Sequence, residues 1–201
     1  MRTKTLNDNS AASDPGSIRL SHAKLRRFHP ELYEPKGPWR WLGRRSPMQE
    51  FWLTRKAEHL LHGDSRAALV VCLQPLLVAA YTDELDCIAL LHFPPELVAE
   101  YGLQIWTRLL TVNLYQAGST PVADLENGPA SYHRYCNFDP LIAEFVSDDF
   151  PRIEYRKAEI SEAEWQRTAA LAHAYFAKRG TLARDGRPMH SGDPATVQVT
   201  G

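Results

Sequence analysis

The chain lacks the short motifs that identify the commonest nucleotide-binding and hydrolytic proteins. It contains no GxxxxGK[ST] phosphate loop, no GxGxxG turn, no CxxC pair and no GxSxG nucleophile motif. Each motif supplies the backbone or side-chain geometry that its chemistry needs. These mechanisms therefore have no support in the sequence, and nothing in it calls for a cofactor.

Cysteine and long apolar runs are also scarce. The three cysteines, Cys72, Cys87 and Cys136, are an odd number in a chain of 201 residues, which does not suit a disulfide framework and indicates a reducing compartment. The apolar run 67–81 is shorter than the ~20 residues of a membrane span, and residues 1–17 lack the apolar region of a signal peptide. We therefore expect a soluble cytoplasmic protein that does not associate with membranes.

The formal net charge of −1 conceals a basic N-terminal region, since residues 1–47 contain ten Lys or Arg against four Asp or Glu. Residues 1–17 have little to bury, and we expect them to be disordered. Residues 18–47 combine basic and aromatic side chains with four prolines, which exclude a long helix or a central strand. This pattern predicts an irregular arm laid over the domain.

The arm carries the candidate partner-binding residues. They are Trp39, Arg40, Trp41, Arg44 and Arg45. A protein partner is the favoured hypothesis. Nucleic acid is the alternative, because Lys and Arg neutralise phosphates and Trp stacks on unpaired bases.

Residues 67–116 hold most of the β-branched and aliphatic side chains, and we expect them to form the sheet. A two-residue hairpin needs positive φ, which Pro75 cannot supply, so 67–82 is interpreted as one long strand bent at Gln74–Pro75. Strands follow at 87–93 and 105–116, and the charged segment 152–158 is interpreted as an edge strand. The prediction is an α+β fold with an antiparallel sheet of about three to five strands.

Two main helices should pack against that sheet, within a single domain spanning residues 18–180. The first covers 48–62, after the N-cap candidate Ser46, and the second covers 162–179, after a capping box formed by Ser161 and Glu164. A short helix should follow Asp139–Pro140. Residues 181–201 are weakly apolar and should form a disordered tail.

The first helix has two stripes of different composition. The stripe expected on the sheet is Leu53, Ala57, Leu60 and Leu61. The stripe expected beneath the arm is Met48, Trp52, Arg55, His59 and His62, flanked by Phe51. His59 and His62 are candidate metal ligands at i, i+3 spacing, but no third ligand is evident, so a polar face is the commoner explanation.

The segment 117–138 shows no period, and loops of this length are often functional. It contains His133, Arg134 and Cys136, which supply the groups of a nucleophile–base pair and an anion-binding cation. No family signature surrounds them. The acidic turn at 83–86 is better explained as turn chemistry than as a cation site.

Taken together, these patterns favour a non-enzymatic binding or accessory protein that acts through the 18–47 arm and the 117–138 loop. One alternative is a small enzyme with a His/Cys site in that loop. The other is nucleic-acid binding through the basic arm.

Overall fold

The structure is a computed structural model that describes residues 12–35, 37, 41, 44–189 and 194–197. The strands are β1 (Asp64–Leu73), β2 (Leu76–Thr82), β3 (Cys87–Phe93), β4 (Arg108–Ala117), β5 (Tyr135–Ile142), β6 (Leu182–Asp185) and β7 (Ala195–Thr196). The helices are α1 (His22–Phe28), the 3-10 turn η1 (Pro30–Leu32), α2 (Pro47–His62), α3 (Glu96–Glu100), α4 (Ala143–Val146), α5 (Phe150–Glu159) and α6 (Glu162–Arg179).

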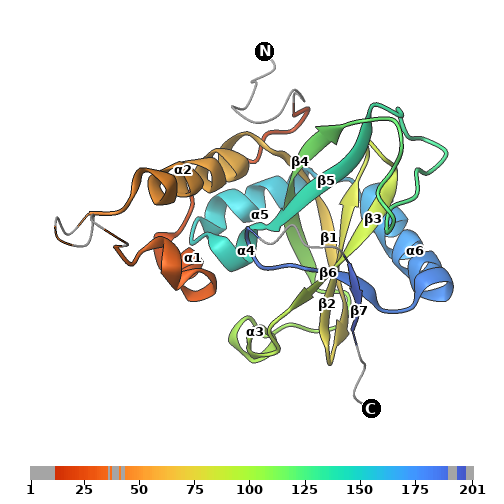
Figure 1. Ribbon diagram of the computed structural model, residues 1–201. Helices are drawn as coiled ribbons and strands as arrows, with labels where there is room; N and C mark the ends of the chain where they lie inside the picture. Colours follow the sequence, from red (N-terminus) through yellow and green to blue (C-terminus); the bar gives the residue numbers. More distant parts are fainter. Residues whose placement is uncertain (1–11, 36, 38–40, 42–43, 190–193, 198–201) are drawn as a thin grey trace.

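A mixed sheet curved into a half-barrel forms the centre of the molecule (Figure 1). Its order is β5-β4-β1-β2-β3-β6, with the two-residue β7 beside β6. All neighbouring pairs are antiparallel except β3 and β6, which run parallel. The chain passes through α3, β4, β5, α4, α5 and α6 between these two strands. The α+β class is correct, but the prediction of an antiparallel sheet of three to five strands is wrong. The extra strand β6 lies in residues expected to be a disordered tail, because four residues are too few to show a period.

The chain reverses at Gln74–Pro75, where the sequence predicted a continuous bent strand. β1 and β2 form an antiparallel hairpin in which Leu73 pairs with Leu76, and the peptide bond before Pro75 is cis. A cis-proline turn reverses the chain without positive φ. The interpretation was wrong because it considered only turns with a trans bond.

Two boundaries near the end of the sheet also differ from the prediction. Residues 152–158 belong to α5, which buries Ile153 and Arg156 at i, i+3 spacing, and do not form an edge strand. Such a short charged segment fits the period of a strand and the period of a helix equally well. Pro140 lies inside β5, which is an edge strand of the sheet. A proline is tolerated there because its missing N–H would face away from the neighbouring strand. The short helix predicted here is α4, which begins only at Ala143.

The two main helices form where the sequence predicted them. Ser46 accepts a hydrogen bond from Gln49 N while Gln49 Oε1 accepts one from Ser46 N at 2.8 Å, which completes a capping box. Ser161 caps α6 by accepting from Glu164 N. The Glu164 carboxylate, however, accepts from Ala67 N of β1 at 2.9 Å, so the start of α6 is held on the sheet.

The N-terminal region is more ordered than predicted over its described part. The expected irregular arm contains α1, and the ammonium of Lys24 donates to the carbonyls of Glu144 and Ser147 at 2.8 and 2.7 Å. Upstream, Asp14 O accepts from Ser65 N at 2.9 Å. These residues therefore pack on the sheet and on α4.

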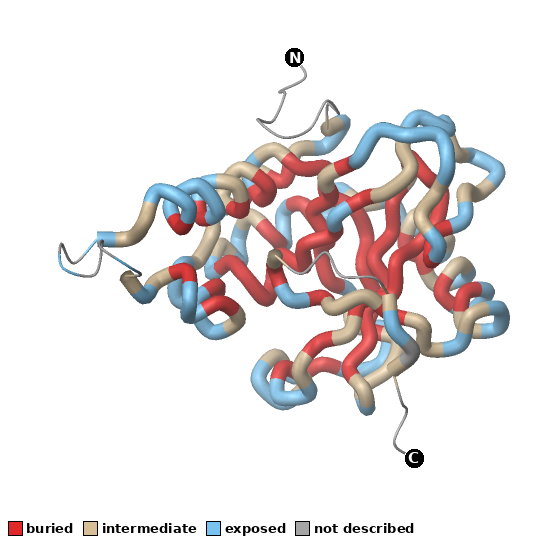
Figure 2. Tube along the Cα trace, in the orientation of Figure 1, coloured by how far each residue is buried: buried red, intermediate tan, exposed pale blue. Residues whose placement is uncertain are grey.

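Both faces of the sheet are covered, and Figure 2 shows its strands as almost continuously buried. One face packs around Phe93, whose ring centroid lies 4.9 Å from that of Phe145 in α4. On the other face, α6 covers β1, β2 and β3, while α2 and α5 pack on β4. The functional groups must therefore be sought at the edges, the loops and the outer helix faces.

Candidate functional site

The loop that joins β4 to β5 places its three candidate residues among separate partners. His133 Nδ1 lies 3.0 Å from Asn127 Nδ2. Arg134 donates to both carboxylate oxygens of Glu84 at 2.7 Å, and this hydrogen bond raises the pKa of Arg134. Cys136 Sγ lies 3.6 Å from the Gln116 carbonyl. None of these contacts joins a thiol to an imidazole, so they do not form the nucleophile–base pair that catalysis requires.

The acidic turn between β2 and β3 is held by arginines from three different elements. The closest pairs are Asp83 with Arg66 at 2.6 Å, Glu84 with Arg134 at 2.7 Å and Asp86 with Arg167 at 2.8 Å. Within the described ranges, no group of three or more His, Cys, Asp or Glu is placed to hold a metal ion. The turn therefore anchors α6 and the 118–134 loop, which joins β4 to β5, to the sheet.

His59 lies on the sheet side of α2, whereas the sequence predicted it beneath the arm. Its Nε2 donates to the Val112 carbonyl at 2.8 Å. Burial, together with the nearby Lys56 ammonium, lowers the pKa of His59 from 6.5 to about 4, so the ring is neutral at neutral pH. His62 follows one turn later and is only partly buried.

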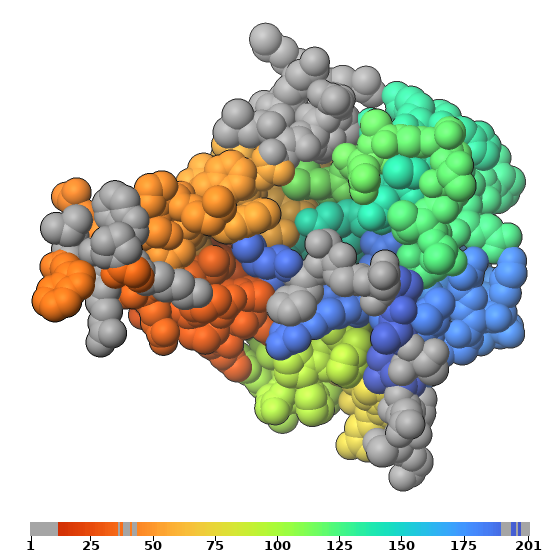
Figure 3. Space-filling view, in the orientation of Figure 1, coloured from red at the N-terminus to blue at the C-terminus, as the bar shows by residue number. Residues whose placement is uncertain are grey.

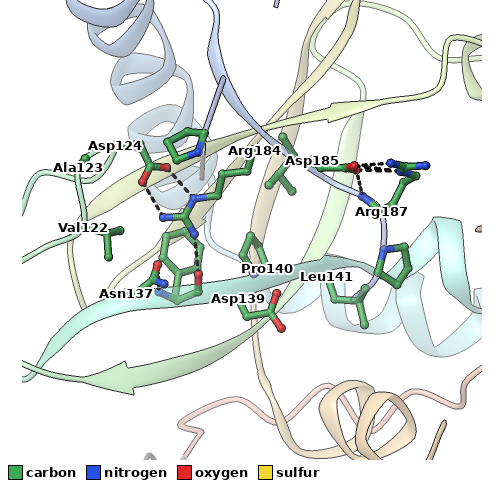
Figure 4. Close-up of a pocket in the computed structure, with 14 residues that line it drawn as sticks. Val122, Ala123, Asp124, Asn137, Asp139, Pro140, Leu141, Arg184, Asp185 and Arg187 are labelled. Carbon is green, nitrogen blue, oxygen red and sulfur yellow. Dashed lines mark hydrogen bonds and ion pairs between the residues drawn. The ribbon is translucent and has the colours of Figure 1, made fainter. Parts of the chain in front are cut away.

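A cavity of about 130 Å³ lies in the seam between β5 and the C-terminal segment that follows α6 (Figure 4). Arg184 crosses this seam: it donates to both Asp124 oxygens at 2.6 and 2.9 Å and to the Phe138 carbonyl at 2.8 Å. Arg187 donates hydrogen bonds to the Asp185 carboxylate, and both residues line the same cavity. These charges neutralise each other, and the Arg184 guanidinium links the two ends of the half-barrel.

A third charged pair fixes α2 to this seam. Lys56 donates to Asp139 Oδ2 at 3.1 Å. Burial alone would raise the pKa of Asp139, but attraction to the Lys56 ammonium lowers it below its ordinary value. Asp139 therefore stays ionised and compensates the buried lysine.

The outer edge of β5 offers little to an added strand. The Cys136 carbonyl accepts from Val122 N at 3.0 Å, and Phe138 N donates to the side chain of Asn137 at 2.9 Å. Pro140 has no N–H, and the Phe138 carbonyl accepts a hydrogen bond from Arg184. Capping edge groups in this way discourages pairing with another chain. The outer edge of β5 at this seam therefore has few free backbone groups with which another strand could pair.

The outer face of α2 differs from the seam because its large side chains are uncovered. Met48, Phe51 and Trp52 are 63%, 50% and 40% exposed. The rings of Phe51 and Trp52 meet edge to face at 5.4 Å, and the Arg55 guanidinium lies 5.6 Å from the Phe51 ring centroid. The sequence placed this stripe beneath the arm, and that prediction is wrong. In Figure 3 the orange surface of α2 lies at one end of the molecule, beside α1.

The five partner-binding candidates precede this face. Trp41 is 92% exposed, Arg44 is exposed, and Arg45 pairs with Glu50 at 2.5 Å. Trp39 and Arg40 lie outside the described residues. Sequence reasoning identified Met48, Phe51 and Trp52 as a group off the sheet-facing stripe but missed that they are exposed.

Many cations of the arm already have partners. Arg27 forms two bonds with Glu100, Arg19 pairs with Asp149 at 3.5 Å, and the Lys24 ammonium lies 3.3 Å from Asp148. By contrast, Arg44 and Arg55 make no ion pair with any residue that the structure describes. Of these two cations, Arg55 lies beside an exposed aromatic ring, that of Phe51.

No protein-family model matches the chain, and the comparisons with curated proteins and with solved structures also give no match. Among the described helices, none has the length and apolar composition needed to cross a bilayer. The geometry of the chain is therefore the basis on which a function is assigned.

Proposed function

We propose that this chain is a non-enzymatic binding protein that docks a protein partner on the outer face of α2 and the arm that precedes it. The observation that carries the proposal is the exposed stripe of Met48, Phe51 and Trp52 on a helix whose opposite face is buried. Contiguous exposed apolar patches usually mark interaction sites. Aromatic residues, Met and Arg are the types enriched at the centres of protein interfaces.

The charges beside the stripe indicate the kind of partner. Arg55 lies over the Phe51 ring, and the exposed Arg44 precedes α2 in the chain; neither forms an ion pair with a described residue. A guanidinium gains most from a carboxylate, which it can bind through two hydrogen bonds. The expected partner surface is an apolar ridge or groove bordered by Asp or Glu.

The two alternative functions have less support. Phosphate binding needs several free cations along a surface, but Arg19, Lys24 and Arg27 are engaged in contacts within the chain. An enzymatic site in the 118–134 loop would need His133 and Cys136 to act together, and they have different partners. That loop lies at the opposite end of the molecule from α2 (Figure 1), so it is considered separately below.

A double substitution on the outer face tests the proposal. Full-length tagged protein carrying Phe51→Ser and Trp52→Ser is expressed in the cells it comes from, cross-linked briefly, and its co-purifying proteins are quantified. The matched control is Tyr155→Ser, which removes an aromatic ring of similar exposure from α5. We expect at least a tenfold loss of one stoichiometric partner with the double variant and no loss with the control.

The same experiment can contradict the proposal. If the double variant recovers the same partner in the same yield as Tyr155→Ser, the outer face of α2 is not the docking surface. Circular dichroism of both variants checks that each remains folded.

A further inference from the structure

The middle of the 118–134 loop covers a second cavity, of about 260 Å³, between itself and α6. Figure 1 shows this loop beside α6. The helix contributes Arg167, Leu171, Ala174, Tyr175 and Lys178. Their spacing places these five side chains on one face of α6. The opposite wall comes from the first residues of β3 and from residues 124–129.

A glycine allows the loop to approach β3 closely. A Cβ added at Gly128 would lie 2.2 Å from the Asp86 carbonyl oxygen, closer than any real contact. Gly128 N also donates to the Leu85 carbonyl at 2.9 Å, and Ala130 N donates to Asp86 Oδ2 at 3.1 Å. The wall formed by the loop is therefore fixed to the sheet.

Ion pairs compensate most of the charges around the cavity. Arg167 donates to both oxygens of Asp86 at 3.1 and 2.8 Å, and Lys178 pairs with Glu126. The third carboxylate in the wall, Asp124, is already bound by Arg184 from the seam side. No carboxylate of this wall therefore lacks a cation.

One guanidinium in the wall forms no ion pair with the described part of the chain. Arg179 donates to the Ala123 carbonyl at 2.5 Å, and it helps Lys178 to lower the pKa of Glu126. Arg179 lies one helical turn beyond Tyr175, at the Asp124 end of the cavity. Its remaining N–H groups can donate to an anionic group at this position.

The interior between these charges is apolar. It is lined by Ile88, Leu171, the ring of Tyr175 and the Cys87 thiol. Burial raises the pKa of Cys87 to about 12, so the thiol is neutral. A volume of about 260 Å³ is several times that of a bound water molecule and holds one small ring, on the order of ten non-hydrogen atoms.

We infer that this cavity binds a small planar ring that carries one carboxylate, with the ring against Leu171 and Tyr175 and the carboxylate on Arg179. This combination matches an apolar cavity with a guanidinium at one end that forms no ion pair and has N–H groups left to donate. The inference does not depend on the docking function of α2, which lies at the other end of the molecule.

Titration of the full-length protein with benzoate, followed by amide chemical shifts, tests the inference. We expect saturable shifts confined to the cavity, including the amides of Ile88, Gly128 and Ala174. Benzamide, which has the same ring and no charge, should bind at least tenfold more weakly. Arg179→Gln should reduce the affinity for benzoate to that for benzamide.

Two further variants keep the result interpretable. Arg152→Gln is the matched control, since Arg152 also donates to a backbone carbonyl and stacks on a tyrosine ring in a helix. It should leave benzoate binding unchanged. Ala174→Phe places a ring at the exposed wall of α6 and should block binding of both probes without removing a charge.

Three outcomes would overturn the inference. These are equal affinity for benzoate and benzamide, benzoate shifts that map elsewhere or do not saturate, and an affinity that Arg152→Gln reduces as much as Arg179→Gln. Each can be observed whether or not a protein partner binds α2.

Discussion

Both faces of α2 depart from the usual distribution of side chains, because the inner face buries polar groups beside its leucines and the outer face exposes large aromatic rings. The inner face buries Lys56 and His59, and the outer face exposes Phe51 and Trp52. Buried polar groups are tolerated when they have partners, and these two have them: Asp139 at 3.1 Å and the Val112 carbonyl at 2.8 Å. The exposed rings pack on each other and on Arg55, with no cover from the described chain. This difference identifies the outer face as the one whose composition the fold does not explain.

The largest expected effect comes from truncating the inner face. Leu60 is fully buried against Leu110 and Val112. Leu60→Ala should lower the free energy of unfolding by roughly 2–5 kcal/mol, because it removes transfer free energy and leaves a cavity. Urea denaturation followed by circular dichroism measures this. A loss below about 1 kcal/mol would mean that α2 is not fixed on the sheet as described.

The second effect is a pH dependence due to His59. The pKa of His59 falls from 6.5 to about 4 on folding, because burial and Lys56 disfavour the charged ring. Between these pH values the unfolded chain binds a proton that the folded chain excludes, so stability decreases as pH falls. The loss is up to about 3 kcal/mol, and it levels off below pH 4.

His59→Gln isolates this contribution. Burial raises the pKa of Asp64 to about 6 and that of Glu144 to about 7, so both titrate in the same range, but they are present in both proteins. As the pH falls from 6.5 to 4, the free energy of unfolding of the wild type should therefore decrease more than that of His59→Gln. Parallel stability curves would contradict the burial of a neutral imidazole.

The third effect concerns the ion pair beneath the helix. Lys56→Met leaves Asp139 without its cation, and we expect a loss of about 1–2 kcal/mol, since the Asp139 side chain is half exposed. A double-mutant cycle with Asp139→Asn should give a coupling energy of about 1 kcal/mol. Titration of Asp139 by NMR should show its pKa returning toward the ordinary value in Lys56→Met. An unchanged pKa would mean that the pair is not formed in solution.

The smallest effect is expected on the outer face. Phe51→Ser together with Trp52→Ser should change the free energy of unfolding by less than about 1 kcal/mol, because Phe51 and Trp52 are 50% and 40% exposed and belong to no core cluster of the described residues. Urea denaturation at neutral pH measures this. A loss above about 2 kcal/mol would show that these rings support the fold and are not free to dock a partner.

The sequence predicted those elements of the fold that are determined by neighbouring residues in the chain. Caps, period and stop residues predicted α2 and α6, and the lack of a period identified the long loop. The β1–β2 reversal was missed because it uses a cis-proline turn, and β6 because it depends on pairing with a distant strand. The helix α5 was missed because its short charged segment fits a strand period as well as a helical one. A four-residue segment such as Leu182–Asp185 acquires its strand only from β3.

The candidate site was predicted only in part, for a similar reason. Trp41 and Arg44 are predicted partner-binding residues; both are exposed, and their role in binding stays a prediction. The orientation of α2 was predicted only in part. Leu53 and Leu60 of the expected sheet-facing stripe are buried, but Leu61 is exposed, and His59 and Lys56 are buried in its place. The contacts that decide this orientation, Lys56 with Asp139 and His59 with Val112, join residues more than 50 positions apart.

A photo-cross-linking amino acid at position 52 tests the central claim most directly. Full-length protein carrying p-benzoylphenylalanine at position 52, or at position 155 as the control, is irradiated in the cells it comes from. We predict a discrete covalent adduct with one protein at position 52 and none at position 155. An absence of adduct at position 52, or the same adduct at both positions, would contradict the assignment of the outer face of α2 as the docking surface.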